Sequence, residues 1–210
     1  NCRRQAAKQV LRQRGESAAI ELREWRTANV APTPKNEHLR LEALWCFQTA
    51  RVVEADLLAD LLRAKDGRVR AAAVRVLSHW KYRLPEQAAR LSQLVNDPHA
   101  RVRLESVRAL SYSPLEHSEY QTAVISADEA DRRQLAVQKH DPSKIEAVLQ
   151  TTNHETDVFL DYAVRMSARE LADQWLPAFR EGRIDFNDNV EHLLAAFSAV
   201  GEGAPVDLLL

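Results

Sequence analysis

The residues of this chain that most often carry chemistry are its seven histidines and two cysteines. A metal site needs such residues at set spacings, because two ligands must share one face of a helix or one tight turn. The closest approaches are His117-Ser118-Glu119 and His154-Glu155, and neither spacing places two ligands on one helical face. No Ser-His-Asp set, glycine-rich phosphate loop or paired-carboxylate motif stands out. The sequence therefore predicts no catalytic residues, no metal site and no cofactor-binding residues.

The two cysteines, Cys2 and Cys46, form no Cys-x-x-Cys pair, so the chain lacks the motif that attaches a c-type haem. They fall on neighbouring predicted helices but are offset by about 10 Å along the helix axis. A disulfide needs Cα atoms within ~7 Å of each other. We therefore expect both cysteines to be free thiols at packed positions.

An arginine recurs at the same place in four similar stretches of the sequence. The stretches are residues 2–10, 38–47, 66–77 and 97–110, and the arginines are Arg3, Arg40, Arg70 and Arg103. These arginines are about 30 to 37 residues apart, and a two-helix unit of that length is the signature of a helical solenoid. The repeat therefore predicts a stack of helix pairs.

The clearest copy, residues 97–110, reads as a turn followed by an amphipathic helix. Asp97-Pro98 is a helix-start signal, and Val102, Ser106 and Leu110 fall on one face at helical spacing. Similar patterns place Trp25 and Leu194 on inward faces, and no segment requires a strand. The predicted helices are residues 2–14, 16–27, 37–49, 54–64, 68–80, 85–96, 101–111, 118–126, 127–139, 142–151, 155–170, 171–182 and 187–200.

The pattern Val-Arg-x-x-Ala-Val-x-x-Leu at residues 69–77 resembles the second helix of HEAT repeats. The resemblance is strongest over residues 38–111, and residues 112–210 would hold degenerate repeats. It implies an all-α fold, a HEAT-like right-handed α-solenoid of antiparallel helix pairs, as a single domain over residues 1–210. In that family the arginine commonly pairs with an acid in the preceding turn. The implied structural ladder is Arg40, Arg70 and Arg103 with Asp66 and Asp97; anion binding by these arginines is the alternative.

Trp45 stands where two other copies of the repeat carry an arginine, at positions predicted to face solvent. An aromatic residue exposed on the second, concave-side helix would be a recognition anchor. The alternative is that the first repeats tilt and bury the indole. The predicted partner contacts on this concave face are Trp45, Glu42, Arg75, Glu105 and Arg108.

The C-terminal part has a closer resemblance. Residues 156–171, followed by Gln174-Trp175-Leu176-Pro177-Ala178, look like a segment of very large secreted proteins from planctomycete-type bacteria. In that family a sugar-dehydrogenase-like propeller is followed by HEAT repeats and a c-type cytochrome domain. The resemblance implies a non-catalytic spacer in a periplasmic or secreted dehydrogenase, with haem c elsewhere in the parent. Since the sequence starts at Asn1, we expect a fragment of such a protein.

The charge balance limits the kinds of partner that the chain can attract. Among 210 residues, 29 Lys and Arg face 30 Asp and Glu, giving a net charge of −1, so nothing attracts the whole chain to nucleic acid. No apolar run approaches the ~20 residues of a membrane span. We expect a protein or a neighbouring domain as partner, with no nucleic acid and no direct membrane insertion. The alternative is a HEAT-like enzyme or binding module similar to bilin lyases or DNA glycosylases, and the acids Glu42 and Glu105 argue against a DNA-binding groove.

Overall fold

The computed structural model describes residues 2–111 and 141–201, and every regular element within them is a helix. The all-α class predicted from the periodicity is therefore confirmed for this part of the chain. The helices predicted at 118–126 and 127–139 lie outside the described residues. The chain divides into two compact units, Asn1–Trp80 and Lys81–Leu210. Because solenoid repeats contact only their neighbours, this division is compatible with the single repeat domain expected over residues 1–210, which stays a prediction.

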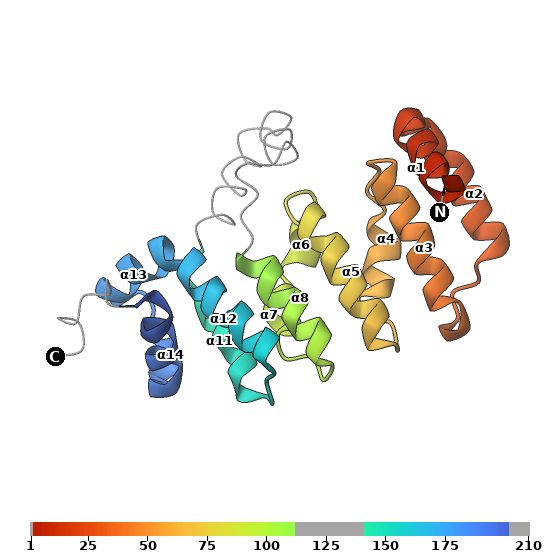
Figure 1. Ribbon diagram of the computed structural model, residues 1–210. Helices are drawn as coiled ribbons and strands as arrows, with labels where there is room; N and C mark the ends of the chain where they lie inside the picture. The colour runs from red at the N-terminus through yellow and green to blue at the C-terminus, as the bar shows by residue number, and fades with distance from the viewer. Residues whose placement is uncertain (1, 112–140, 202–210) are drawn as a thin grey trace. The chain divides into compact units, whose positions relative to one another are not determined.

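The first unit is built around α3 (Glu37–Thr49), which packs against the other α-helices of the unit (Figure 1). Leu44 and Phe47 on its inner side are fully buried. The inner side of α5 (Gly67–Trp80) packs beside it with Val69 and Val74, also fully buried. The other elements of the unit are α1 (Cys2–Arg14), α2 (Ser17–Asn29), the 3-10 turn η1 (Pro34–Asn36) and α4 (Ala55–Leu61).

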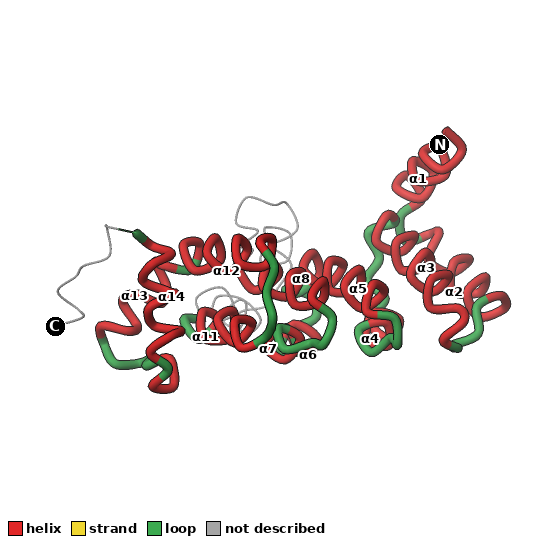
Figure 2. The backbone as a smooth tube through the Cα atoms, turned by 60° about the horizontal axis from the view of Figure 1, so that its bottom comes forward, coloured by secondary structure: helices red, strands yellow, loops and turns green. Residues whose placement is uncertain are grey.

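The second unit is built around α12 (Val158–Glu170), which lies between α8 (Ala100–Ser111) and α14 (Val190–Val200). Figure 2 shows α8 and α12 side by side in one layer, with α7 (Leu91–Leu94) and α11 (Lys144–Gln150) in a second layer. Each pair of consecutive helices thus buries its apolar side against the next pair, as in an α-solenoid. The other elements are α6 (Pro85–Ala88), η2 (Thr151–Asn153), α13 (Ala172–Arg180) and η3 (Phe186–Asp188).

Several helix ends lie where local signals in the sequence put them. Gly15 ends α1 with a left-handed φ of 52°, a conformation that glycine adopts without steric cost. The Asp157 carboxylate caps α12 by accepting from the backbone N–H groups of Phe159 (3.0 Å) and Leu160 (2.8 Å). The helix predicted at 85–96 is instead two short helices, because the N–H of Arg90 bonds three residues back, which interrupts the α-helical pattern.

The inward assignments of Trp25 and Leu194 from the sequence are wrong. Trp25 of α2 is 43% exposed, because the small residues Ala18 and Ala19 take the buried side of that helix. Leu194 of α14 is 52% exposed, and its helix turns His192 and other residues inward instead. In both helices the predicted period is right, and the face assigned to one large apolar residue is not.

The end of the second unit is closed by a cluster of aromatic rings. Trp175 is fully buried, and it meets Phe186 and Phe197 edge to face at centroid distances of 5.7 and 5.4 Å. Phe179 adds contacts to the same two rings at 5.7 and 5.5 Å. The Trp175 indole N–H donates to the carbonyl of Ala168 at 2.9 Å, so the ring is buried with its polar atom satisfied.

Phe186 enters this cluster from a strained turn. Phe186, Asn187 and Asp188 all have left-handed φ angles, of 57°, 54° and 58°, which are costly for residues other than glycine. Two carboxylates hold the turn: Asp185 accepts from the N–H of Asn187 at 2.8 Å, and Glu146 from that of Phe186 at 3.1 Å. Burial of the Phe186 ring and these two hydrogen bonds offset the strain.

Substitution of Trp175 should test how far this cluster stabilises the second unit. Trp175→Ala removes a fully buried ring and leaves a cavity, so the free energy of unfolding should fall by about 3–5 kcal/mol. Urea denaturation followed by circular dichroism measures the change. Trp25→Ala is the matched control, because that ring is 43% exposed and should cost less than about 1 kcal/mol. Equal losses for the two variants would contradict this account of the core.

Candidate interaction surface

Arg103 ties the start of α8 to two neighbouring turns. Its side chain is buried, and Nη1 donates to the carbonyl oxygens of Asp97 (3.0 Å) and Pro98 (3.3 Å) in the preceding turn. Nη2 donates to the carbonyl of Glu155 at 2.6 Å, before α12. The carboxylate partner expected for Arg103 is therefore corrected to backbone carbonyls. The reason is local: the Asp97 carboxylate accepts from the N–H of His99 at 2.8 Å and so fixes the turn itself.

The other two ladder arginines, Arg70 and Arg40, also contact neighbouring segments of the chain. Arg70 Nη1 donates to the carbonyl oxygens of Ala64 (2.8 Å) and Lys65 (3.1 Å) in the turn before α5. Arg40 pairs with the carboxylate of Asp60 on α4 at 2.6 Å. All three arginines thus connect a second helix to a neighbouring segment, which favours the structural interpretation over anion binding.

Asp66 joins α3 to α5. Its carboxylate accepts from the backbone N–H of Arg68 at 2.8 Å, pairs with the Arg68 guanidinium at 2.9 Å and lies 3.2 Å from Nε2 of His38 on α3. Hydrogen bonds from Arg68 hold the pKa of Asp66 well below its usual range. The carboxylate is therefore ionised throughout the physiological range and acts as a fixed acceptor.

The structure leaves the predicted anchor, Trp45, between the two alternatives. Trp45 is half-buried on α3, while Glu42 on the same helix and Arg75 on α5 are exposed. Its predicted role as a recognition anchor stays a prediction. Cys46 beside it is half-buried, and the side chain of Cys2 lies outside the described residues, so the expected pair of free thiols is also still a prediction.

Glu105, predicted as a partner contact, is instead only 4% exposed. Its carboxylate lies 3.1 Å from the guanidinium of Arg101 and 3.7 Å from that of Arg108. These two side chains are 53% and 63% exposed. The burial of Glu105 follows from its position between two arginines at helical i−4 and i+3 spacing, which cover it. Glu105 therefore orients the two guanidinium groups and leaves them at the surface.

The largest exposed apolar side chains of α8 and α12 do not follow from the repeat pattern. Val158, Phe159 and Tyr162 in the first turns of α12 are 73%, 71% and 66% exposed. The repeat register puts Val158, Tyr162, Ala163 and Met166 on the core side. Ala163 is buried as expected, but Val158 and Tyr162 are exposed and Leu160 is buried instead. The sequence does contain a signal for this exposure. Apolar residues at 158, 159, 160 and 162 cover more than half of the helix circumference, so one face cannot bury them all.

Two contacts hold α8 beside α12 and bring their exposed sides together. The buried hydroxyl of Ser167 donates to that of Ser111 at 2.9 Å near one end, and Arg103 bonds the carbonyl of Glu155 near the other. Figure 2 shows the two helices side by side, and each of them carries exposed side chains, arginines on α8 and aromatic rings on α12. We call this surface the α8–α12 face; it comprises Arg101, Arg108, Val158, Phe159 and Tyr162.

Within residues 2–111 and 141–201, no three histidine, cysteine or acidic side chains lie close enough to hold a metal ion. No helix in the same part of the chain is long and apolar enough to cross a membrane.

Comparison with known proteins identifies one family within the chain. Residues 30–111, which run from the segment before α3 to the end of α8, match the family model for HEAT repeats. This match and the all-helical structure establish a HEAT-repeat segment with an α-solenoid fold. No curated protein matches the chain, and no solved structure does. HEAT repeats commonly act as protein-interaction modules, so the matched segment suggests a helical-repeat scaffold or interaction module.

Removal of the Arg103 guanidinium should destabilise the second unit. Arg103→Met leaves three carbonyl oxygens without their charged donor, so the free energy of unfolding should fall by about 2–3 kcal/mol. Urea denaturation measures the loss. Arg165→Met, at an exposed position of α12, should change it by less than about 0.5 kcal/mol. If both variants unfold at the wild-type urea concentration, the ladder role of Arg103 is wrong.

Proposed function

We propose that this chain is a non-catalytic scaffold that binds a protein partner through the α8–α12 face. The observation that carries the proposal is the exposure of Phe159 and Tyr162 on α12, a helix that packs against α8 and its two surface guanidinium groups. Exposed aromatic side chains in a cluster are unfavourable in water. Tyrosine and arginine are also the residue types that dominate binding energy at protein interfaces. A partner that covers this face removes the apolar area from water.

The chemistry of the face defines the kind of partner. Arg101 and Arg108 share the single carboxylate of Glu105, so the three groups together keep a positive charge. The adjoining Val158, Phe159 and Tyr162 offer an apolar surface. The partner that complements both is a protein segment with acidic side chains next to aliphatic or aromatic ones. Charge attraction would speed the encounter, and burial of the rings would supply most of the affinity.

The resemblance to planctomycete-type proteins supports a specific setting for this function. In that setting the chain is the spacer between a sugar-dehydrogenase-like propeller and a c-type cytochrome domain, and it lies in the periplasm or outside the cell. The chain itself would be no enzyme and would bind no cofactor, and haem c would be held elsewhere in the parent. The partner of the α8–α12 face would then be one of the flanking domains.

Site-specific cross-linking tests the proposal and identifies the partner in the same experiment. A photoreactive phenylalanine analogue at position 159 of the full parent protein should form cross-links to one defined protein segment, identified by mass spectrometry. The same analogue at Ile20, which is 64% exposed on α2, is the matched control. A cross-link within the propeller or the cytochrome domain supports the spacer. Cross-links from position 159 that are as scattered as those from position 20 would contradict a binding face.

Loss of the two rings should abolish the interaction without unfolding the chain. The double variant Phe159→Ser and Tyr162→Ser removes two exposed aromatics, so affinity for the cross-linked segment should fall about 30-fold or more. Isothermal titration calorimetry measures this change. The free energy of unfolding should stay within about 0.5 kcal/mol of wild type, because neither ring is buried. Retention of DNA by the wild type with a steep dependence on salt would instead favour the nucleic-acid alternative.

A further inference from the structure

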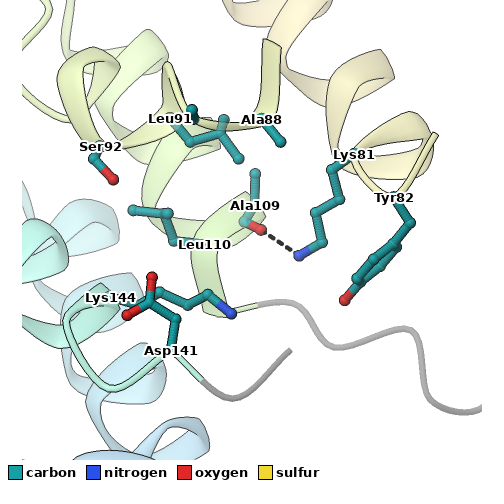
Figure 3. Close-up of a pocket in the computed structure, with 10 residues that line it drawn as sticks. Lys81, Tyr82, Ala88, Leu91, Ser92, Ala109, Leu110, Asp141 and Lys144 are labelled. Carbon is teal, nitrogen blue, oxygen red and sulfur yellow. Dashed lines mark hydrogen bonds between the residues drawn. The ribbon is translucent and has the colours of Figure 1, made fainter. Parts of the chain in front are cut away.

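A cavity of about 200 Å³ lies within the second unit, against α6, α7 and the end of α8. Alanine and leucine side chains make up half of its lining, and the other half is made of two lysines, a tyrosine, a serine and an aspartate (Figure 3). The lining residues are Lys81, Tyr82, Ala88, Ala89, Leu91, Ser92, Ala109, Leu110, Asp141 and Lys144. The cavity is therefore an apolar space with amino groups at its edge.

Lys81 is the buried amine of this cavity. Its side chain is only 7% exposed, and Nζ donates to the carbonyl oxygen of Ala109 in the last turn of α8 at 2.7 Å. Nζ also lies 5.3 Å from the centre of the Tyr82 ring. Burial lowers the pKa of Lys81 to about 7, and the positive charge of Lys144 adds to this shift. A neutral amine with an electron pair on Nζ is therefore accessible to Lys81 near neutral pH.

One charged group that lines the cavity, Lys144, adds to the effect of burial on the pKa of Lys81. Among the described residues, two other charged side chains line the cavity with Lys81 (Figure 3). Lys144 lies at the start of α11, and Asp141 lies in the segment before it. Burial lowers the pKa of Lys144, and the carboxylate of Asp141 opposes that shift. A lysine becomes a nucleophile at neutral pH when it lies in an apolar pocket or beside another cation. Lys81 meets both conditions.

We propose that this cavity binds a small apolar aldehyde or ketone as an imine of Lys81. The Nζ electron pair attacks the carbonyl carbon, and the C=O π electrons move to oxygen. The nitrogen loses one proton to the oxygen, which gives a carbinolamine. Protonation of its hydroxyl by the Lys144 ammonium lets the C–O bond break, and the oxygen leaves as water while the C=N bond forms. The second Nζ proton then returns to Lys144, so one amine and one carbonyl give one imine and one water.

The walls of the cavity select for the carbonyl compound. Leu91, Leu110 and Ala88 offer van der Waals contacts to a short hydrocarbon chain, and the cavity is too small for a large ligand. Water is released when the amine condenses, and the apolar wall disfavours its return. Lys81 therefore differs from an exposed lysine in two respects: burial favours its neutral amine, and an apolar cavity lies beside it.

Reductive trapping at pH 7 tests the proposal on the full chain, with hexanal and cyanoborohydride as the probe. The reaction fixes any imine as a stable secondary amine, and peptide mass mapping locates it. Lys81 should be modified roughly a hundredfold faster than the exposed Lys35 and Lys65, which do not line the cavity. Lys65→Met should leave the modification of Lys81 unchanged.

Two further readouts separate a ligand site from a merely reactive amine. The ratio of the modification rate at Lys81 to that at Lys65 should increase with the chain length of the aldehyde, from acetaldehyde to hexanal. Ala88→Leu, which fills the cavity but keeps the amine in place, should remove this dependence on chain length. The rate at Lys81 should level off above about pH 7, because its amine is then mostly neutral. Equal rates at Lys81 and Lys65, or a preference independent of chain length, would overturn the proposal.

The same amine should make the stability of the chain depend on pH. Lys81 has a pKa of about 7 in the folded chain and 10.5 as an ordinary lysine, so between these values the unfolded chain binds more protons. Stability should therefore rise with pH from 7 to 10. Urea denaturation at both pH values measures the rise, and Lys81→Met should show a smaller one. A rise of the same size in Lys81→Met would show that Lys81 keeps its proton when folded.

Discussion

A pair of antiparallel helices cannot bury its own apolar side, and this constraint governs the whole structure. The side chains of α12 show the result: Leu160 and Ala168 lie under neighbouring helices and are almost completely buried. Stability therefore comes from the interfaces between successive pairs. Polar contacts such as the hydrogen bond from Arg103 to the carbonyl of Glu155 fix the position of one helix along the axis of the next. The inner side of each helix is thus used for packing, and the outer side remains exposed for contact with a protein partner.

Much of the helical content could be predicted because helix signals are local. A period of 3.6 residues, a capping Asp157 and an ending Gly15 are all properties of a few adjacent residues. Rotation of a helix about its axis is not local, since it depends on what lies beside the helix. A change of one residue in register rotates the face by about 100°, which is why the pattern assigns Leu194 and Tyr162 to the core although they are exposed.

The candidate surface was harder to predict than the fold. Arg108 is exposed, as expected, but the sequence pattern alone did not reveal Glu105 as the acid that Arg101 and Arg108 cover, although the i−4 and i+3 spacing is visible. Lys81 has no local signal at all. Its burial depends on the end of α8 and on the start of α11, which are distant in the sequence, so only the folded chain reveals its chemistry.

The α8–α12 face and the Lys81 cavity share helix α8. Arg101 and Arg108 of the proposed binding face lie along this helix, while the carbonyl of Ala109 in its last turn holds Lys81. Proximity to a shared helix does not by itself couple two sites, because coupling requires a ligand that binds two positions of that helix with different affinity. The contacts at Arg103 and Ser111 fix α8 against α12 at both ends. Occupation of the cavity should therefore leave the partner-binding affinity unchanged as long as these contacts hold.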